Sequence, residues 1–332
     1  MTSVTGVSAP DPSPTSSVAS RSTGRLGDRV FSGLSIGAGT LVVVLVLLIG
    51  LFLVTQAVPA LQRNEVNFLT SSEWTVSGEH PRFGVAGLLW VTVVSSIIAM
   101  LLAVPVGVAV ALFLTQYAPT WLARPAAGTI DLLAAVPSIV YGLWGLRQFG
   151  PVLVPVQQFF AQYFGWIPIF APNNGLSGNV STIFVVGVVL AIMILPIVTA
   201  LSREVFAQTP RAHIEGAMAL GATKWETIRT AVLPFGKPGV ISAAMLGLGR
   251  ALGETLAVTI ILATLAPGTP WVASLFNGGE TFASKIANNA GEFDTPQKTG
   301  AFLAAGLVLF LLTFVVNAIA RIVIERRKAF SE

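Results

Sequence analysis

Residues 203–256 read REVFAQTPRAHIEGAMALGATKWETIRTAVLPFGKPGVISAAMLGLGRALGETL. The first half of this stretch is charged and is broken by glycine and proline, which is typical of a loop that a soluble partner can grip. The second half places Arg250 and Glu254 inside a long apolar run. Ionisable groups at membrane depth usually face a protein interior or a water-filled path. Together, the two halves favour a subunit of a driven transport system.

The composition around this stretch is that of a membrane protein. The chain has 332 residues, of which 54% are hydrophobic and 10% are charged. Globular proteins carry roughly a quarter charged residues. Several uncharged runs exceed the roughly 20 residues that cross a bilayer as a helix. Because these runs are continuous and do not alternate in polarity, helices are favoured over a barrel. We therefore expect an all-α polytopic membrane protein.

Six transmembrane helices are the simplest division of the apolar sequence. Between the third and the fourth, residues 151–178 are uncharged but broken by prolines and glycines. We expect this segment to be interfacial or re-entrant, anchored by Tyr163 and Trp166, rather than a regular spanning helix. The predicted spans are 31–56, 83–123 with a bend near Pro105, 127–148, 181–201, 238–265 and 299–322.

Lysine and arginine indicate how the spans are oriented. With a cytoplasmic N-terminus, that side of the membrane receives 13 of the 19 basic residues and the opposite side receives 4. Both termini and the long loop after the fourth span are therefore expected to be cytoplasmic. The predicted domains are a disordered tail at 1–28, a first helix with an external loop at 29–82, a core at 83–322 that contains the loop 202–237, and a tail at 323–332.

Several classes of chemistry are disfavoured by the sequence. There are no cysteines and two histidines, His80 and His213, so we nominate neither a metal site nor a catalytic residue. The chain lacks the G-x-x-x-x-G-K-[ST] pattern and is not expected to hydrolyse ATP by that route. The sequence pI of about 9.8 is explained by the positive-inside bias, so no nucleic acid partner is expected.

The loop 202–237 contains signals for two short helices. Thr209 is predicted to cap a helix that begins at Pro210 and ends at Gly221 in a left-handed conformation. A capping box at 223–226 begins a second helix, and Pro234 and Pro238 are expected to mark the turn back into the membrane. Glu215 and the small residues Gly216, Ala217 and Ala219 would face outward. This surface suits docking in a partner's groove, and a loop lying on the membrane is the alternative.

Arg250 and Glu254 are four residues apart and would share one helix face. They either neutralise each other in a structural pair or line a solute path. Arginine before glutamate is the weaker order for an i, i+4 pair, which favours the path. A guanidinium grips two oxygens of a tetrahedral oxyanion, although these residues do not choose phosphate over sulfate or molybdate. Gly247, Gly249 and Gly253 allow a close helix approach or a local break.

Two further candidates for this substrate path follow Pro137 in the third predicted span. Ser138 and Tyr141 could contact the solute, and hydrogen bonds to neighbouring helices are the alternative.

The loop resembles the EAA loop of ATP-binding-cassette (ABC) importer permeases. In that family the loop is a coupling helix that inserts into a cleft of the ATPase subunit, and the resemblance implies the same role here. Gly216 and Ala231 stand where the family has alanine and isoleucine. The matching positions are Glu215, Ala217, Gly221, Leu233 and Pro234.

Three other stretches are similar to phosphate-specific permeases of this family. They are GLGRALGETLAV at 247–258, PSIVYGLWGL at 137–146 and the run at 83–119. Leu256-Ala257 after GET favours the PstC type over the related PstA type, which typically has Ala-Pro. The resemblance implies a type I (MetI-like) ABC importer permease fold in a bacterial plasma membrane.

The same resemblance implies partners and leaves alternatives. The expected partners are a PstA-type permease, a PstB-type ATPase dimer, a PstS-type extracytoplasmic phosphate-binding protein, inorganic phosphate and membrane lipid. No cofactor is expected on this chain, since ATP and Mg would be used by the ATPase. The alternatives are a permease for sulfate or molybdate, the PstA-type subunit itself, and a secondary anion transporter that needs no docking loop.

Overall fold

The computed structural model describes residues 26–171, 179–265, 269 and 271–328. Of the predicted tail at 1–28, residues 1–25 lie outside this part of the chain, and the next residues already belong to helix α1 (Leu26–Gln62). The described residues are mostly helical. Their departure from the all-α prediction is a short antiparallel pair of strands, β1 (Trp74–Thr75) and β2 (Arg82–Phe83).

The chain divides into two units, residues 1–49 and residues 50–332. The described part of the first unit is the N-terminal portion of α1, and its side chains at 27–49 are exposed. A helix satisfies its own backbone hydrogen bonds, so an apolar helix of this kind is stable against lipid.

Five helical segments in the described residues are long and apolar enough to cross a bilayer. The predicted count of six is reached if α3 (Thr120–Ala134) and the helix that follows it, which bend by 91°, form one broken span. The five segments are Gly27–Gln62, Ala86–Tyr117, Ile183–Ala207, Lys224–Gly253 and Pro296–Ile322. All but Ala86–Tyr117 extend beyond the predicted bounds at one end or both, and Lys224–Gly253 ends before the predicted residue 265.

The broken span differs from the single helix predicted for 127–148. The helix stops at Ala134 and begins again as α4 (Ser138–Trp144), which continues through the π-helical turn η2 (Gly145–Phe149) into α5 (Gly150–Phe164). Residues 151–164 are therefore helical and follow the bend of 91°. Such a bent pair is a broken span or a re-entrant loop, which agrees with the prediction that 151–178 is not a regular spanning helix. Of the predicted segment, residues 172–178 lie outside the described part.

Helix α6 (Ile183–Ala207) is the most buried of the apolar helices and packs between α2 (Ala86–Leu112) and α9 (Leu233–Gly253). Val198 of α6 lies between two glycines. A Cβ built on Gly107 of α2 or on Gly247 of α9 would lie 3.1 Å from a Val198 methyl group. The missing side chains thus let both neighbours approach α6 closely.

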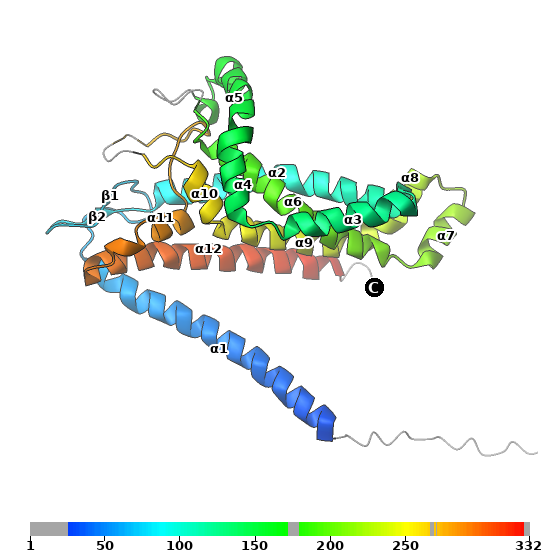
Figure 1. Ribbon diagram of the computed structural model, residues 1–332. Helices are drawn as coiled ribbons and strands as arrows, with labels where there is room; N and C mark the ends of the chain where they lie inside the picture. Colours follow the sequence, from blue (N-terminus) through cyan, green and yellow to red (C-terminus); the bar gives the residue numbers. More distant parts are fainter. Residues whose placement is uncertain (1–25, 172–178, 266–268, 270, 329–332) are drawn as a thin grey trace, which may run out of the picture. The chain divides into compact units, whose positions relative to one another are not determined.

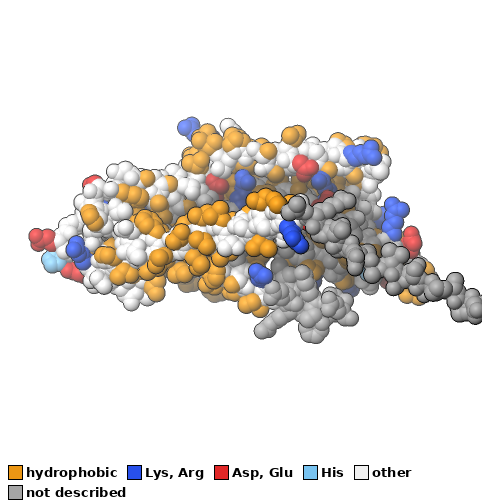
Figure 2. Space-filling model, turned by 90° about the horizontal axis from the view of Figure 1, so that it is seen from below, with side chains coloured by type: hydrophobic (Ala, Val, Ile, Leu, Met, Phe, Trp, Pro, Cys, Tyr) orange, Lys and Arg blue, Asp and Glu red, His pale blue; other side chains and the backbone are white. Residues whose placement is uncertain are grey.

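The remaining elements separate toward two ends of the 50–332 unit (Figure 1). Helices α7 and α8 lie at one end, while β1, β2 and α11 lie at the other. Figure 2 shows many hydrophobic side chains exposed on the face of the described residues that it draws. The other elements are η1 (Phe113–Tyr117), η3 (Pro168–Phe170), α7 (Arg211–Ala219), α8 (Lys224–Thr227), η4 (Ile228–Val232), α10 (Leu256–Ile261), α11 (Phe282–Asn288), η5 (Ala290–Glu292) and α12 (Pro296–Lys328).

Candidate functional site

Helices α7 and α8 form a compact knob, residues 211–227, at one end of the 50–332 unit. Gly221 has φ +85°, the left-handed conformation that was predicted at the end of the first helix. The capping box is also confirmed, because the Thr223 hydroxyl accepts from the Glu226 N–H and the Glu226 carboxylate accepts from the Thr223 N–H. Local sequence signals alone therefore define the shape of the knob.

The outer surface of the knob carries the residues expected to meet a partner. Glu215 and Gly216 are exposed, and Ala217 is half-buried. No side chain lies within 4 Å of a Cβ built on Gly216. Beside them, Met218 and Leu220 are 52% and 91% exposed. Large apolar side chains in such open positions, next to small residues, give a surface that another protein can bury.

Two details of the predicted loop are wrong. Thr209 is buried and does not cap α7; Pro210 occupies the N-cap position, and no side-chain hydrogen bond is made there. Pro234 and Pro238 do not mark a turn, because both lie in α9. The π-helical turn η4 joins α8 to α9 without a break, so both prolines lie inside one continuous helical segment.

Buried contacts tie the knob to the membrane helices. Ile214 of α7 and Leu233 of α9 pack against a cluster of Ala111, Phe206 and Val232. This cluster brings together α2, the end of α6 and the turn before α9. The knob is thus anchored to three elements.

The charged residues of the second half of the stretch lie at an interruption of the helix. Helix α9 ends at Gly253, and Glu254 has an extended backbone with ψ 125°. The chain is helical again from Leu256 in α10. Their spacing predicted that Arg250 and Glu254 share one helix face, and this prediction is wrong because the helix ends between them. The local break that Gly253 permits is present.

Glu254 turns toward the second helix rather than toward Arg250. It is 9% exposed, and its Oε1 accepts a hydrogen bond of 3.1 Å from the Ala257 N–H. Among the described residues, Arg250 and Glu254 form no ion pair. The Nε of half-buried Arg250 is shielded from solvent and has no hydrogen-bond partner in this part of the chain. Unsatisfied buried donors of this kind are rare in proteins and suit a group that binds a ligand.

The other two predicted path residues belong to α4, which lies on α10. A Cβ on Gly142 would lie 3.0 Å from the Cα of Ala257. Tyr141 is buried and donates to the Leu133 carbonyl at 2.9 Å. The hydrogen bond to a neighbouring helix, one of the two alternatives for Tyr141, is thus present. Half-buried Ser138 begins α4.

Two interrupted spans therefore meet at the candidate site. One is interrupted at residues 135–137 and the other at 254–255. Irregular backbone at membrane depth is tolerated where it is buried in protein or lines a cavity, and transporters use it to bind ions and charged substrates. Sequence reasoning missed the first interruption, although Pro137 disfavours a helical conformation at the residue before it. Asp131 near this bend pairs with Arg203 of α6 at 3.4 Å.

Comparisons with known proteins agree with this architecture. Residues 103–329 match the family described as "Binding-protein-dependent transport system inner membrane component". A curated relative from Mycobacterium tuberculosis, "Phosphate transport system permease protein PstC 2", is 54% identical over 299 residues, covering 90% of this chain and 91% of the relative.

Two further permeases and one solved structure are also similar. "Phosphate transport system permease protein PstC" from Mycobacterium leprae is 55% identical, covering 82% and 85% of the two chains. The protein of the same name from Xylella fastidiosa strain 9a5c is 41% identical, covering 80% and 81%. A chain of the inward-facing MetNI methionine ABC transporter is 19% identical, with a TM-score of 0.48 and coverage of 74% and 94%. The chain belongs to the binding-protein-dependent transport system inner membrane component family, in its PstC group.

Proposed function

We propose that the chain is the transmembrane permease subunit of an ATP-driven importer of inorganic phosphate. The observation that carries the proposal is the pair of interrupted helices around Arg250. They supply an unsatisfied guanidinium nitrogen at membrane depth, while the exposed knob lies at one end of the same unit. The curated relatives named as phosphate transport permeases support phosphate as the substrate.

In this proposal Arg250 attracts the anion and Glu254 positions it. A guanidinium donates to two phosphate oxygens at once. A carboxylate repels a bare anion, but it accepts a hydrogen bond from a phosphate that still carries a proton. Ser138 and Tyr141 of α4 complete the path on the facing helix.

The knob would transmit force from the ATPase to this site. Its contacts with the partner would be made by Glu215, Gly216 and Ala217, while Gly221, Leu233 and Pro234 hold its shape and its connection to α9. Residues Lys224–Gly253 form one helical segment of 30 residues that begins in α8 of the knob and ends at the interruption at Glu254. At 1.5 Å per residue, this segment is about 45 Å long. It can therefore carry a displacement of the knob to Arg250 and change the side from which the site is open.

The other subunits follow from this role. A homologous PstA-type permease would complete the path, a PstB-type dimer would bind and hydrolyse ATP with Mg, and a PstS-type protein would deliver phosphate from outside the cell. The chain itself is proposed to have no enzymatic activity and no cofactor. We place both termini and the knob in the cytoplasm because most lysines and arginines fall on that side.

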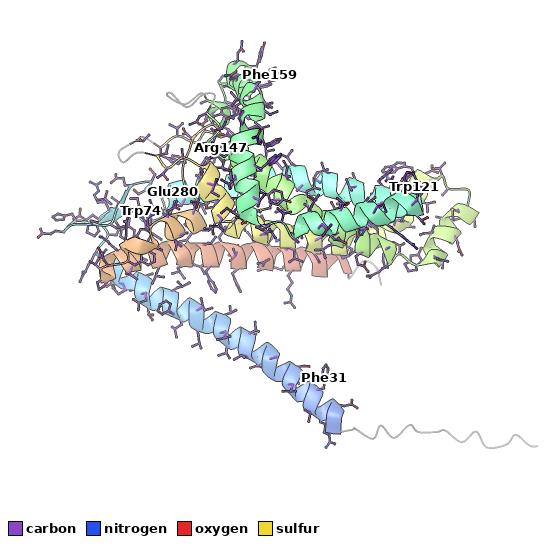
Figure 3. The ribbon with its side chains drawn as sticks, viewed as in Figure 1. Phe31, Trp74, Trp121, Arg147, Phe159 and Glu280 are labelled. Carbon is purple, nitrogen blue, oxygen red and sulfur yellow. The ribbon has the colours of Figure 1, made fainter. Side chains whose placement is uncertain are left out.

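Uptake by the reconstituted complex tests the proposal. Phosphate, sulfate and molybdate are offered separately with ATP, and we expect phosphate to be taken up in preference to the others. Arg250→Ala should lower phosphate uptake about 10- to 100-fold, since a hydrogen bond to a charged group contributes about 1.5–3 kcal/mol. Arg147→Ala is the matched control, because Arg147 is exposed on the α4–α5 helix (Figure 3).

Three results would reject the proposal or one of its parts. Preference for sulfate or molybdate would reject the substrate. ATP-independent uptake would favour a secondary transporter. Failure of the Arg250→Ala chain to assemble with its partners, while Arg147→Ala assembles, would make Arg250 a structural residue.

A further inference from the structure

The knob is connected to the membrane helices at both of its ends. After the knob, the chain runs through η4 into α9, the route that leads to Arg250. Before the knob, only residues 208–210 separate the end of α6 from α7. Phe206 in the last turn of α6 belongs to the cluster against which Ile214 of the knob packs. A displacement of the knob therefore acts on α6 as well as on α9.

Helix α3 packs against α6 but is held there loosely. None of the side chains of α3, all of which the structure describes, is buried. The helix runs from the end that carries the knob, where Figure 3 shows Trp121 of its first turn, toward α4 (Figure 1). At its far end, the Leu133 carbonyl accepts the hydrogen bond from Tyr141 of α4. The position of α3 therefore bears on α4, the helix that carries Ser138 and Tyr141.

An ion pair joins α3 to α6. The Nη2 of Arg203 lies 3.4 Å from Oδ2 of Asp131 and 3.5 Å from its Oδ1. Both distances exceed about 3.2 Å, the usual upper limit for a hydrogen bond from nitrogen to oxygen. The two carboxylate oxygens thus share one nitrogen of the guanidinium. The side chains of Arg203 and Asp131 are 22% and 54% exposed, and ion pairs at such positions contribute little to stability. The pair can therefore open and close at small cost.

The other terminal nitrogen of Arg203 is left over in this arrangement. Nη1 is shielded from solvent and has no hydrogen-bond partner among the described residues. Shielded donors without a partner are rare in proteins. A guanidinium binds a carboxylate most favourably when two of its nitrogens each donate to one oxygen. A shift of α3 against α6 that brings Nη1 to one of the Asp131 oxygens would shorten the contacts and satisfy both nitrogens.

We propose that Arg203 and Asp131 are positioning residues whose contact tightens during the transport cycle. The pair is open in this structure, with both oxygens on Nη2. When the ATPase displaces the knob, α6 shifts against α3 and the pair closes into the two-nitrogen form. The closed pair pulls α3 with α6 and, through the Leu133–Tyr141 hydrogen bond, moves α4. Both interrupted spans then move together, one through α9 and the other through α3. This inference rests on the proposed function, since it assumes that the ATPase acts on the knob.

Arg203→Lys tests whether the two-nitrogen contact is needed. Lysine keeps the positive charge, but its ammonium is a point charge without the planar fork of a guanidinium. We expect normal assembly, an unchanged KM for the phosphate-loaded binding protein and a maximal uptake rate lowered about fivefold, because one hydrogen bond of the closed pair is lost. A residue that only stabilises the fold would give no such separation of rate from KM.

The matched control for Arg203→Lys is Arg124→Lys. Arg124 is exposed on α3 and forms no ion pair with another described residue. The control has the same change of side chain on the partner helix, and its uptake rate should equal that of the wild type. Equal rates for both variants would overturn the inference.

Exchange of the two charges tests the pair itself. Asp131→Arg and Arg203→Asp each place like charges together and should lose most of the uptake. The double variant restores the pair in the opposite direction, and its uptake should return to within about threefold of the wild type. Failure to recover in a double variant that assembles would contradict the pairing. If the double variant does not assemble, the rate of Arg203→Lys still decides.

Spin labels measure the proposed movement directly. The chain has no cysteine, so Leu132→Cys on α3 and Ala207→Cys on α6, both at exposed positions, can be labelled in a complex whose other subunits are free of cysteine. The distance between the labels should differ between the nucleotide-free and the ATP-bound complex, and Arg203→Lys should broaden the ATP-bound distribution. An identical distance in the two states of the wild type would overturn the inference.

These outcomes separate the inference from the proposed function. If the wild-type complex takes up phosphate with ATP while Arg203→Lys behaves as Arg124→Lys does, the inference alone fails. If uptake by the wild type needs no ATP, the proposed function fails. If the wild type prefers another oxyanion but the label distance still changes with ATP, the positioning role stands and phosphate is rejected as the substrate.

Discussion

At Glu254, a single carboxylate serves both backbone and substrate in our proposal. Its Oε1 accepts from the Ala257 N–H where α10 begins, and it is nearly buried beside a proposed anion path. A carboxylate that only caps a helix can be replaced by a neutral acceptor of the same shape. A carboxylate whose second oxygen also accepts from a protonated phosphate cannot, because an amide has only one acceptor oxygen.

Substitution of Glu254 separates these two roles. Glu254→Gln keeps an acceptor for Ala257, so we expect thermal stability within about 0.5 kcal/mol of the wild type but phosphate uptake lowered at least about tenfold. Glu254→Ala should lose about 1 kcal/mol of stability as well. The measurements are thermal unfolding in detergent and uptake by the reconstituted complex. Normal uptake by Glu254→Gln would show that the residue is a helix cap.

Single residues also explain which local features the sequence could predict. The Thr223–Glu226 capping box and the left-handed Gly221 depend on neighbours within a few positions, so their pattern determines their geometry. Thr209 has the residue type of a cap, but it is buried and Pro210 takes the cap position. Thr209 is buried by the helices that pack around it, and this tertiary packing overrides its local preference for the N-cap position.

At the scale of elements, the knob depends on one backbone conformation. Gly221→Ala places a side chain at φ +85°, which costs about 1–2 kcal/mol. We expect the turn between α7 and α8 to loosen and the co-purification of the ATPase subunit to fall. Gly128→Ala is the control, since that position of α3 is helical and open and lies outside the knob. Equal recovery of the ATPase with both variants would contradict this account of the knob.

The contact between α6 and α9 gives a second prediction for the elements. A Cβ on Gly236 would lie 2.5 Å from ring carbons of Phe206, which is 1% exposed. Gly236→Ala should therefore destabilise the folded protein by about 1–3 kcal/mol. Gly249→Ala should not, because nothing lies within 4 Å of that position. Thermal unfolding of the two variants in the same detergent measures the difference, and equal midpoints would refute the close packing.

The interruptions show where prediction of the elements from sequence ends. The apolar runs predicted the long helices, because length and polarity are local properties. At the bend at 135–137, the Tyr141 hydroxyl of α4 donates to the Leu133 carbonyl of α3. The break at 254–255 lies just before α10, on which α4 packs. Pro137 and Gly253 permit such breaks, but only the packing of two distant segments makes them favourable.

For the molecule as a whole, the proposal requires that ATP hydrolysis and transport be coupled through the knob. Leu220 is 91% exposed on that surface. Leu220→Glu would place a charge where a partner is expected to bury an apolar side chain. Burying a leucine is worth about 1.5–3 kcal/mol, so binding of the ATPase should weaken at least about tenfold.

The control for Leu220→Glu is Trp121→Glu, a change at another exposed apolar position, in α3 at the same end of the unit. Titration of the ATPase onto each membrane-embedded variant measures the affinity. Unchanged affinity for Leu220→Glu would exclude this part of the knob from the contact. Loss in both variants would indicate a general effect of negative charge at this end.

The sequence predicts single residues of the candidate site, but it does not predict which distant segments of the molecule pack together around them. Arg250, Glu254 and Tyr141 could be nominated singly, since charged or polar groups in apolar runs are rare. The packing of α4 on α10 could not be predicted, because the two segments lie far apart in the sequence and carry no shared pattern.

The position of Val198 between Gly107 and Gly247 has a consequence for how this protein can change over evolutionary time. One side chain fills two hollows, so the three positions hold a fixed total volume. An alanine at position 107 or 247 would be compatible with a residue smaller than valine at 198. A residue larger than valine at 198 would be compatible with alanine at neither position. Homologous chains should therefore show correlated substitutions at these three positions, and ancestors that lost one glycine should have changed residue 198 at about the same time.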